Sequence, residues 1–498
     1  MYPSTLIDGV LARLREAPAA EALRDERGAI TGGELSATSG RLAFALLNHG
    51  VRRGDRLLLG LPPDRRFVTT LLAALRLGVV VVPVHPQAKL RELAHLLWDA
   101  GPRVVCAEAP LADLVRSAAS AVRLLDPEAL LAEPLEDAGV ELYHDHAGVT
   151  AAEGDPALIL YTSGTTGKPK GAVHTQGSLA ANLAALAQAW RLSRGDRLLH
   201  CLPLHHLHGI AVGLLGSLFS GAAVELVAVF DESAVVERLA ASRATLFFGV
   251  PAMYARLVQA GPRAPMPSMR LFVCGSAPLA PALKREFEAR FGQAILERYG
   301  ATEMGIALSQ EVDGPRPAGS VGRPLPGVET RLVRPDDGAD ATDSAEAGEL
   351  WVRGPSLFRG YHEDEEATAQ VMSSGWYRTG DLVRRAPDGS FAILGRLSTD
   401  LIKVKGHRVG ALEIEAALAE HPGVAEVAVV GAPDAECGEV VVAFVRRRDA
   451  ALTEPALLAH ARRLLAPFQV PRRVEFVEEL PRIGPGKIDK ASLKARCS

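Results

Sequence analysis

Residues 157–171 read ALILYTSGTTGKPKG, an apolar run that leads directly into a loop of glycines, hydroxyl side chains and lysines. The run Ala157–Tyr161 is typical of a buried strand. We expect a second strand at Ala172–Thr175, then a helix that Ser178 would cap and whose apolar residues recur at helical spacing up to Trp190. Strand, loop and helix in this order predict an α/β fold with its binding site at the ends of strands.

The loop YTSGTTGKPKG, at residues 161–171, has the chemistry of a polyphosphate site. Its glycines let the backbone approach a ligand closely, while its hydroxyls, backbone N–H groups and lysines donate to phosphate oxygens. It differs from a P-loop, because only two residues separate Gly164 from Gly167. A surface hairpin turn is the structural alternative. The residues expected to contact the ligand are Thr162, Ser163, Gly164, Thr165, Thr166, Gly167 and Lys168.

Apolar runs alternate with helix-like segments along most of the chain. Arg56–Leu61 and Gly78–Val84 are expected to be buried strands of a parallel sheet. From Leu325 to Gly354 the pattern changes to short strands around a polar loop. The end of the chain predicts a separate small α/β unit, so the expected domains are residues 1–396 and 397–498. The elements expected in this unit are helices at 411–420 and 454–465 and strands at 424–430 and 440–446.

The composition argues against several classes of protein. The 498 residues include 55 basic and 59 acidic side chains, a formal net charge of −4, which gives no electrostatic case for binding nucleic acid. The most apolar stretch, Leu71–Val84, is interrupted by Arg76 and Pro83, so we expect no membrane insertion. Five scattered cysteines without CxxC spacing, and an N-terminus without a secretory pattern, predict a reduced cytoplasmic protein without a zinc site.

Together with five later segments, the loop resembles the signature of the adenylate-forming superfamily. This superfamily contains acyl-CoA synthetases, the adenylation domains of peptide synthetases and firefly-type luciferases. The later segments, in the superfamily's order, are GSAP at 275–278, YGATE at 299–303, YRTGD at 377–381, GR at 395–396 with DLIK at 400–403, and PRIGPGK at 481–487. The resemblance covers essentially the whole chain and implies a large multi-sheet N-terminal domain and a small mobile C-terminal domain.

The resemblance also implies that the N-terminal domain binds ATP and Mg²⁺. Glu303 and Thr165 would hold the metal ion, which neutralises the phosphates, and Thr302 would donate to the α-phosphate. Tyr299 would stack on adenine, and Asp381 would accept the ribose hydroxyls. The remaining nucleotide contacts that the motifs imply are Gly275, Ser276, Ala277, Pro278, Glu297, Gly300 and Arg396.

The implied reaction has two halves. The carboxylate of an acid attacks the α-phosphorus of ATP and releases pyrophosphate, while Lys487 of the small domain stabilises the transition state. The small domain then turns about a hinge near Ser398, and coenzyme A displaces AMP to leave a thioester. Lys403, Lys405 and Gly406 would line the path of the thiol. Relatives often carry Asp or Lys at the hinge, so Ser398 leaves the pivot residue open.

The identity of the acid depends on polar residues of the expected acyl pocket. Arg298 in ERYG, Arg256 in VPAMYAR and His208 in HHLHG are similar to the malonyl-CoA synthetase branch of the superfamily. A buried arginine would oppose a fatty chain but bind a second carboxylate, through charge-assisted hydrogen bonds of about 1.5–3 kcal/mol each. We therefore expect malonate, or methylmalonate, as substrate. The resemblance also implies that His206 lies at the nucleotide or acyl gate, and the pocket volume near Met304 would decide whether methylmalonate fits.

Each of these residues has a structural alternative. Arg298 would then pair with Glu297 or another acid, Arg256 would be a surface arginine, and His208 would be a packed histidine. Rival functions are an aryl or medium-chain monocarboxylate synthetase, a stand-alone adenylation enzyme that loads a carrier protein, and a non-catalytic nucleotide-binding protein. Residues 246–254 lack the acid that amino-acid adenylation domains use for the substrate amine, which disfavours the second rival. The oligomeric state stays open.

Overall fold

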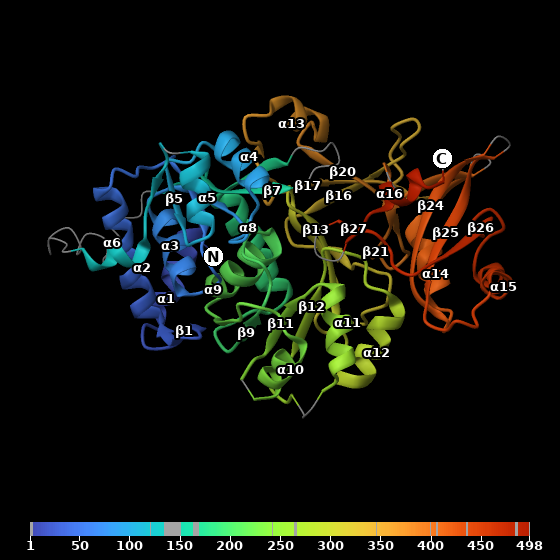
Figure 1. The fold of residues 1–498 in the computed structure, drawn as a ribbon, viewed down its shortest axis with the longest axis horizontal. Helices are drawn as coiled ribbons and strands as arrows, with labels where there is room; N and C mark the ends of the chain where they lie inside the picture. Colours follow the sequence, from blue (N-terminus) through green and yellow to red (C-terminus); the bar gives the residue numbers. More distant parts are fainter. Residues whose placement is uncertain are drawn as a thin grey trace.

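The computed structural model consists of a large α/β part and a smaller α/β part at the C-terminal end (Figure 1). It describes residues 3–119, 121–133, 151–162, 169–241, 243–262, 266–344, 346–398, 400–404, 407–434, 437–483 and 487–497, without the side chains of 407, 408, 483 and 487. This arrangement of several sheets and a small terminal unit confirms the predicted fold class.

Within the described residues, the largest sheet has nine strands. Its strands, in spatial order, are β15 (Arg323–Pro324), β14 (Gly305–Ser309), β13 (Leu296–Ala301), β12 (Leu271–Cys274), β11 (Leu246–Gly249), β9 (Arg197–His200), β10 (Ala223–Leu226), β1 (Glu21–Asp25) and β2 (Gly28–Thr31). The strands from β1 to β13 pair in parallel, and β14 runs antiparallel to β13. β13 therefore stands where the parallel part of the sheet ends.

The second sheet carries the glycine loop. Its strands, in spatial order, are β18 (Gly360–Tyr361), β8 (Lys170–Thr175), β7 (Pro156–Thr162), β4 (Val80–Pro83), β3 (Arg56–Gly60), β5 (Val104–Ala107) and β6 (Arg123–Leu124). The two predicted buried strands are present as β3 and β4, which run parallel with Arg56 opposite Val80. β7 and β8 are antiparallel, and Tyr161 lies opposite Gly171, so the loop joins the two strands of a hairpin.

Helices pack against both sheets, and one hydrophobic core joins them. This core contains Leu57 and Leu59 of β3 together with Leu198 of β9 and Val224 of β10. The helices of the large part are α1 (Leu6–Glu16), α2 (Gly32–Asn48), α3 (Arg65–Arg76), α4 (Leu90–Ala100), α5 (Leu111–Ala118), α6 (Pro127–Ala132), α8 (Gln176–Ala189), the π-helix η1 (His208–Leu215), α9 (Gly216–Ser220), α10 (Glu232–Ala241), α11 (Pro251–Ala260), α12 (Pro281–Phe291) and α13 (Glu365–Val371).

The helix after the hairpin, α8, begins earlier than predicted. Its N-cap is Thr175 rather than Ser178. Thr175 Oγ1 accepts the Ser178 N–H at 3.0 Å, and Ser178 Oγ accepts the Thr175 N–H at 3.0 Å, so Ser178 is the second member of a reciprocal capping box. At the other end Trp190 is fully buried, and its Nε1 donates to Ser309 Oγ at 2.9 Å, which ties the helix to β14.

A third, antiparallel sheet links the large part to the small one. It contains β16 (Glu329–Val333), β17 (Gly348–Arg353), β20 (Trp376–Arg385), β19 (Met372–Ser373) and β21 (Phe391–Arg396). The short strands predicted between Leu325 and Gly354 are thus present, and β16 pairs with β17. Asp381 of β20 lies opposite Arg396 of β21, which brings two of the predicted nucleotide-binding residues together.

The small part contains the predicted helices and strands. Its elements are β22 (Leu401–Val404), β23 (His407–Gly410), α14 (Ala411–Ala419), β24 (Val424–Asp434), β25 (Gly438–Arg447), α15 (Glu454–Leu464), β26 (Arg473–Val477), β27 (Arg482–Ile483), β28 (Lys487–Ile488) and α16 (Lys490–Ala495). Buried side chains from Ile402 onward form hydrophobic clusters of their own. We keep the domain boundary after Arg396 as a proposal.

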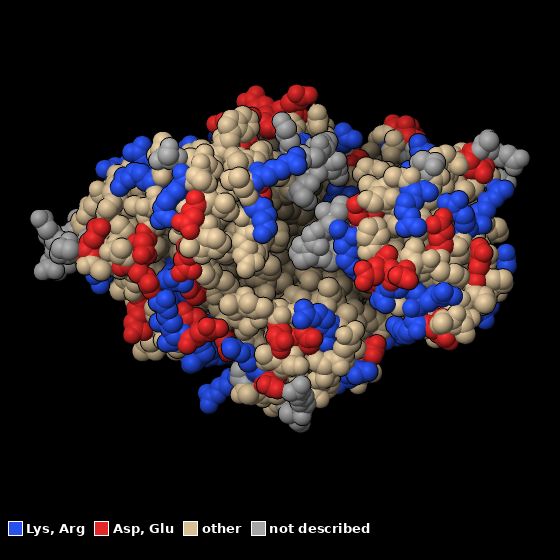
Figure 2. Space-filling model, in the orientation of Figure 1, with Lys and Arg blue, Asp and Glu red and all other residues tan. Residues whose placement is uncertain are grey.

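Figure 2 shows basic and acidic residues interspersed over the visible face, which is hollowed near its centre where the large and small parts meet. In the described part of the chain, no helix is both long and apolar enough to cross a membrane.

A buried ion pair behind β13 generates a stability prediction. Lys284 Nζ of α12 lies 2.7 Å from Glu297 Oε1 and 3.1 Å from Gln310 Oε1, and Lys284 and Glu297 are both buried. Lys284→Met leaves the carboxylate buried without its cation, so we expect the free energy of unfolding to fall by about 3–5 kcal/mol. The double variant Lys284→Met/Glu297→Leu removes both charges and should recover most of that loss. Denaturant unfolding checks this, and equal stability of the single and double variants would contradict it.

Candidate active site

Tyr299, Asp381 and Arg396 form the first cluster of predicted residues. The Tyr299 hydroxyl donates to Asp381 Oδ2 at 2.5 Å, and Arg396 Nε lies 2.9 Å from Asp381 Oδ1. Burial raises the pKa of Tyr299 well above its usual value, and Asp381 adds to the shift, so the hydroxyl keeps its proton and acts as a donor. Burial opposes the charge of Arg396, but Asp381 raises its pKa above the usual value. The cluster thus holds a buried carboxylate in a fixed orientation, as recognition of a sugar's hydroxyls requires.

Thr302 and Glu303 follow β13 and are fixed from neighbouring strands. His174 of β8 donates through Nε2 to the Thr302 carbonyl at 2.5 Å, and burial lowers the pKa of His174 to about 4, which keeps the ring neutral. The Tyr361 hydroxyl donates to Glu303 Oε1 at 2.8 Å. Among the described residues no hydrogen bond reaches the other oxygen of Glu303. Glu303 is a largely buried residue, and its second carboxylate oxygen has the chemistry of a Mg²⁺ ligand, so the residue present fits the predicted metal site.

Several predicted residues lie outside the described part of the chain. These are the loop residues Ser163, Gly164, Thr165, Thr166, Gly167 and Lys168, then Lys405 and Gly406, and the side chain of Lys487.

The residues that flank the glycine loop are described, and those on its two sides have different contacts. Thr162 ends β7, and the Tyr161 hydroxyl beside it donates to Asp99 of α4. On the other side, Lys170 Nζ lies 5.3 Å from the centre of the Tyr361 ring, and Tyr361 binds Glu303. Lys170, the first residue of β8, is therefore linked through Tyr361 to Glu303.

The predicted GSAP segment, residues 275–278, follows β12 and packs on Arg298. A Cβ atom on Gly275 would lie 2.4 Å from Arg298 Nε, so only glycine permits this approach. Ser276 has a φ of 71°, in the left-handed region that serine rarely adopts. The Ser276 hydroxyl lies 3.3 Å from Arg298 Nη2 and 3.4 Å from His208 Nδ1, which brings three predicted residues into one cluster.

Arg298 and His208 are buried polar groups with unfilled hydrogen-bonding capacity. Arg298 Nε and His208 Nε2 have no hydrogen-bond partner among the described residues, and no carboxylate there forms an ion pair with Arg298. Burial lowers the pKa of Arg298 to about 10, so the guanidinium is still charged at neutral pH. Burial, with Arg298 nearby, lowers the pKa of His208 well below its usual value, so the ring is neutral. A buried cation beside two polar side chains is a site for an anion.

Arg256 does not join this cluster. Its side chain is 48% exposed, pairs with Glu232 of α10, and lies over the Phe230 ring at 4.9 Å. The structure therefore places Arg256 as its structural alternative described it, at the surface and apart from Arg298, Ser276 and His208. The VPAMYAR segment forms α11 with Tyr254 and Leu257 facing the core, which turns Arg256 toward the surface.

The side chains of Glu297 and Met304 have contacts that the sequence did not predict. Neighbouring residues of a strand point to opposite faces, so Glu297 faces Lys284 while Arg298 faces Ser276. The structural alternative, in which Arg298 pairs with Glu297, is not found, because Glu297 forms its ion pair with Lys284. The predicted nucleotide contact of Glu297 stays a prediction. Met304 is fully buried in the core beneath the third sheet, where it has a packing role.

The histidines near His208 form a wider cluster than the motifs indicated. The His206 and His205 rings lie 4.1 Å apart, and His85, which follows β4, lies 5.0 Å from His205. Burial lowers the pKa of His206.

His85, His174 and Tyr361 were missed because no motif marks them. The position of His174 in the strand after the glycine loop was the available signal. Lys403 is exposed on β22, and Gly300 lies within β13.

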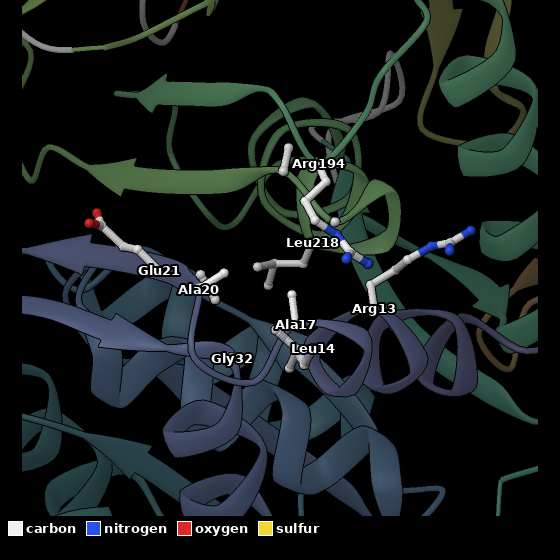
Figure 3. A pocket seen from close by; sticks show the side chains of 11 residues that line it. Arg13, Leu14, Ala17, Ala20, Glu21, Gly32, Arg194 and Leu218 are labelled. Carbon is white, nitrogen blue, oxygen red and sulfur yellow. The ribbon is translucent and has the colours of Figure 1, made fainter.

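A separate surface hollow does not coincide with these clusters. It has a volume of about 50 Å³ and is lined by residues of α1, β1 and α9 (Figure 3). Arg13 and Arg194 point along it, but each pairs with Glu16, at 2.9 and 2.6 Å. Both arginines thus have an acidic partner within the protein, and the hollow contains none of the predicted site residues.

Comparisons with known proteins agree with this geometry. The model of the AMP-binding enzyme family matches residues 11–362, and that of the AMP-binding enzyme C-terminal domain matches residues 413–487. A malonate–CoA ligase of Arabidopsis thaliana is 36% identical over 486 residues, 89% of this chain and 78% of that protein. A feruloyl-CoA synthase of an Amycolatopsis species is 35% identical over 490 residues, 97% of each chain.

The solved structures show the same fold. The crystal structure of ATP-bound MatB from Rhodopseudomonas palustris superposes with a TM-score of 0.88 at 34% identity and covers 99% of both chains. The chain therefore belongs to the AMP-binding enzyme family and is an acid–thiol ligase that uses ATP, Mg²⁺ and coenzyme A.

Proposed function

We propose that this ligase joins malonate, with methylmalonate as a related substrate, to coenzyme A through an acyl-adenylate. The observation that carries the proposal is Arg298, a buried guanidinium without an acidic partner among the described residues. Its neighbours Ser276 and His208 supply a hydroxyl and a neutral imidazole. A dicarboxylate has one carboxylate to react and a second to neutralise Arg298.

An aryl monocarboxylate is the second candidate, because the feruloyl-CoA synthase relative is about as similar as the malonate–CoA ligase. Such an acid would leave Arg298 buried beside an apolar group. The desolvation of a buried charge without a counterion costs on the order of several kcal/mol in free energy. Because none of the described acidic side chains pairs with Arg298, malonate is favoured.

The other predicted residues would serve the first half-reaction. Asp381 and Arg396 would position the ribose, and Thr302 would donate to the α-phosphate. Glu303 and Thr165 would hold Mg²⁺, which when bound neutralises the phosphate charge. Lys487 would bring a cation from the small domain to the transition state. In the second half-reaction, the path of coenzyme A would be lined by Lys403, Lys405 and Gly406.

We also propose a reducing compartment such as the cytoplasm. All five cysteines are free thiols, which fits a chain that never meets an oxidising environment.

The substrate prediction is tested by removing the charge of Arg298. For Arg298→Met we expect kcat/KM for malonate to fall by about 10- to 100-fold, because one or more charge-assisted hydrogen bonds are lost. Rates with hexanoate or benzoate should hold or rise. Arg256→Met is the matched control and should resemble the parent enzyme with every acid. If the parent enzyme prefers hexanoate, benzoate or ferulate to malonate, the malonate assignment is wrong.

The metal prediction concerns Glu303. Glu303→Gln keeps the shape of the side chain but removes the charge that binds Mg²⁺, so adenylation should need about 10- to 100-fold more Mg²⁺. Titration of Mg²⁺ in an ATP–pyrophosphate exchange assay measures this. Glu311→Gln, an exposed acid that pairs with Arg323, serves as control. An unchanged Mg²⁺ dependence in Glu303→Gln would remove Glu303 from the metal site.

A further inference from the structure

Lys490 lies in a buried ion cluster within the small C-terminal part. Its Nζ atom lies 2.7 Å from Asp400 Oδ1 and 2.8 Å from Glu415 Oε1. The three side chains are each less than 15% exposed, at 13%, 12% and 14%. One cation thus holds two buried carboxylates together. The three residues come from three separate segments of the chain. We call Lys490, Asp400 and Glu415 the buried triad.

Asp400 connects the triad to the strand that leaves the large part. Its Oδ2 atom accepts the Arg396 N–H at 3.0 Å, and the Asp400 N–H donates to the Arg396 carbonyl at 2.8 Å. Arg396 in turn pairs with Asp381 in the first cluster of the site. A Cβ atom on Gly395, whose φ is 146°, would lie 2.6 Å from Asp400 Cβ, so the backbone here is closely packed. Asp400 therefore fixes the backbone on both sides of the predicted hinge near Ser398.

Glu415 connects the triad to the sheet of the small part. Its Oε1 atom also accepts the Val429 N–H of β24 at 2.7 Å. Burial raises the pKa of Glu415, and Lys490 opposes that shift. Burial alone would lower the pKa of Lys490, but Glu415 and Asp400 raise it above the usual value. Lys490 and Glu415 thus each favour the charged form of the other, and the buried geometry of the triad is that of a specific arrangement rather than a chance surface contact.

Lys490 is covalently close to Lys487. β28 consists of Lys487 and Ile488, and Asp489 then caps α16, which begins at Lys490. The Asp489 N–H donates to the Pro481 carbonyl at 2.8 Å, so the short segment between Lys487 and Lys490 is held at both ends. The backbone of Lys487 is thus only three residues from the triad, with the fixed Asp489 between them.

We propose that Lys490 is a positioning residue, which through Asp400 holds the backbone of Lys487 at a set place relative to the hinge. This inference rests on the proposed role of Lys487 in adenylation. A displacement of about 1 Å in a catalytic group is enough to lower a rate by about 100-fold. Loss of the triad should thus impair adenylation, in which Lys487 acts, more than transfer of a preformed acyl-adenylate to coenzyme A.

The test compares Lys490→Gln, Lys490→Arg and Lys494→Gln. Lys494 is the matched control, because it lies on the same helix and pairs with Glu439 at 2.9 Å but is 47% exposed. Acid-dependent ATP–pyrophosphate exchange measures adenylation, a supplied acyl-adenylate with coenzyme A measures transfer, and thermal unfolding measures stability. We expect Lys490→Gln to lower adenylation at least about tenfold and transfer less than about threefold. Lys490→Arg should restore most of the adenylation rate, and Lys494→Gln should match the parent enzyme.

Three results would overturn the inference: adenylation and transfer falling in proportion, neither falling, or Lys494→Gln showing the same selective loss. If Lys490→Gln does not fold, Asp400→Asn replaces it, because that variant keeps the Lys490–Glu415 pair and an oxygen for the Arg396 N–H. It should show the same selective loss, and Glu415→Gln a smaller one.

Lys487→Ala separates this inference from the proposed function. If Lys487→Ala keeps normal adenylation, the proposed role of Lys487 and the inference both fail. If Lys487→Ala abolishes adenylation while Lys490→Gln and Asp400→Asn do not impair it, the inference alone fails.

Discussion

Burying a guanidinium removes its water, and the free energy lost must be offset by an anion or by several hydrogen-bond acceptors. Arg298 is buried at the site with a single hydrogen bond to Ser276 at 3.3 Å, and its Nε has no partner among the described residues. Gly275 is needed for this position, because any side chain there would collide with the guanidinium. The burial of Arg298 is costly, and the backbone at Gly275 leaves room for it. A ligand that neutralises the guanidinium would explain both features.

The geometry around Arg298 depends on one strand, β13. Its consecutive residues face different partners: Glu297 meets Lys284 behind the sheet, Arg298 meets Ser276, and Tyr299 meets Asp381. The residues that follow the strand are held as well, because His174 donates to the Thr302 carbonyl and Tyr361 donates to the Glu303 carboxylate. The proposed acyl, ribose and metal sites would thus be neighbours, because a single strand and the residues that follow it supply side chains to each.

Much of this arrangement was predictable from the sequence. The apolar runs and the motifs predicted the α/β class, the hairpin strands around the glycine loop, the small terminal unit, and the approach of Asp381 to Arg396. What failed depended on the direction of side chains. Arg256 lies on a helix whose buried face includes Tyr254 and Leu257, and Glu297 has a buried lysine partner on α12 that no local pattern indicates. The cap of α8 was misplaced because Thr175 and Ser178 both have capping side chains and only their reciprocal bonds decide between them.

The central claim is that Arg298 binds the second carboxylate of a dicarboxylic acid. The most direct measurement is a crystal structure of the enzyme with a non-hydrolysable mimic of malonyl-adenylate. The account predicts that the distal carboxylate lies within hydrogen-bonding distance of the Arg298 guanidinium, with Ser276 or His208 as a further contact. A distal carboxylate bound elsewhere, with Arg298 paired to an acidic side chain of the protein, would contradict it.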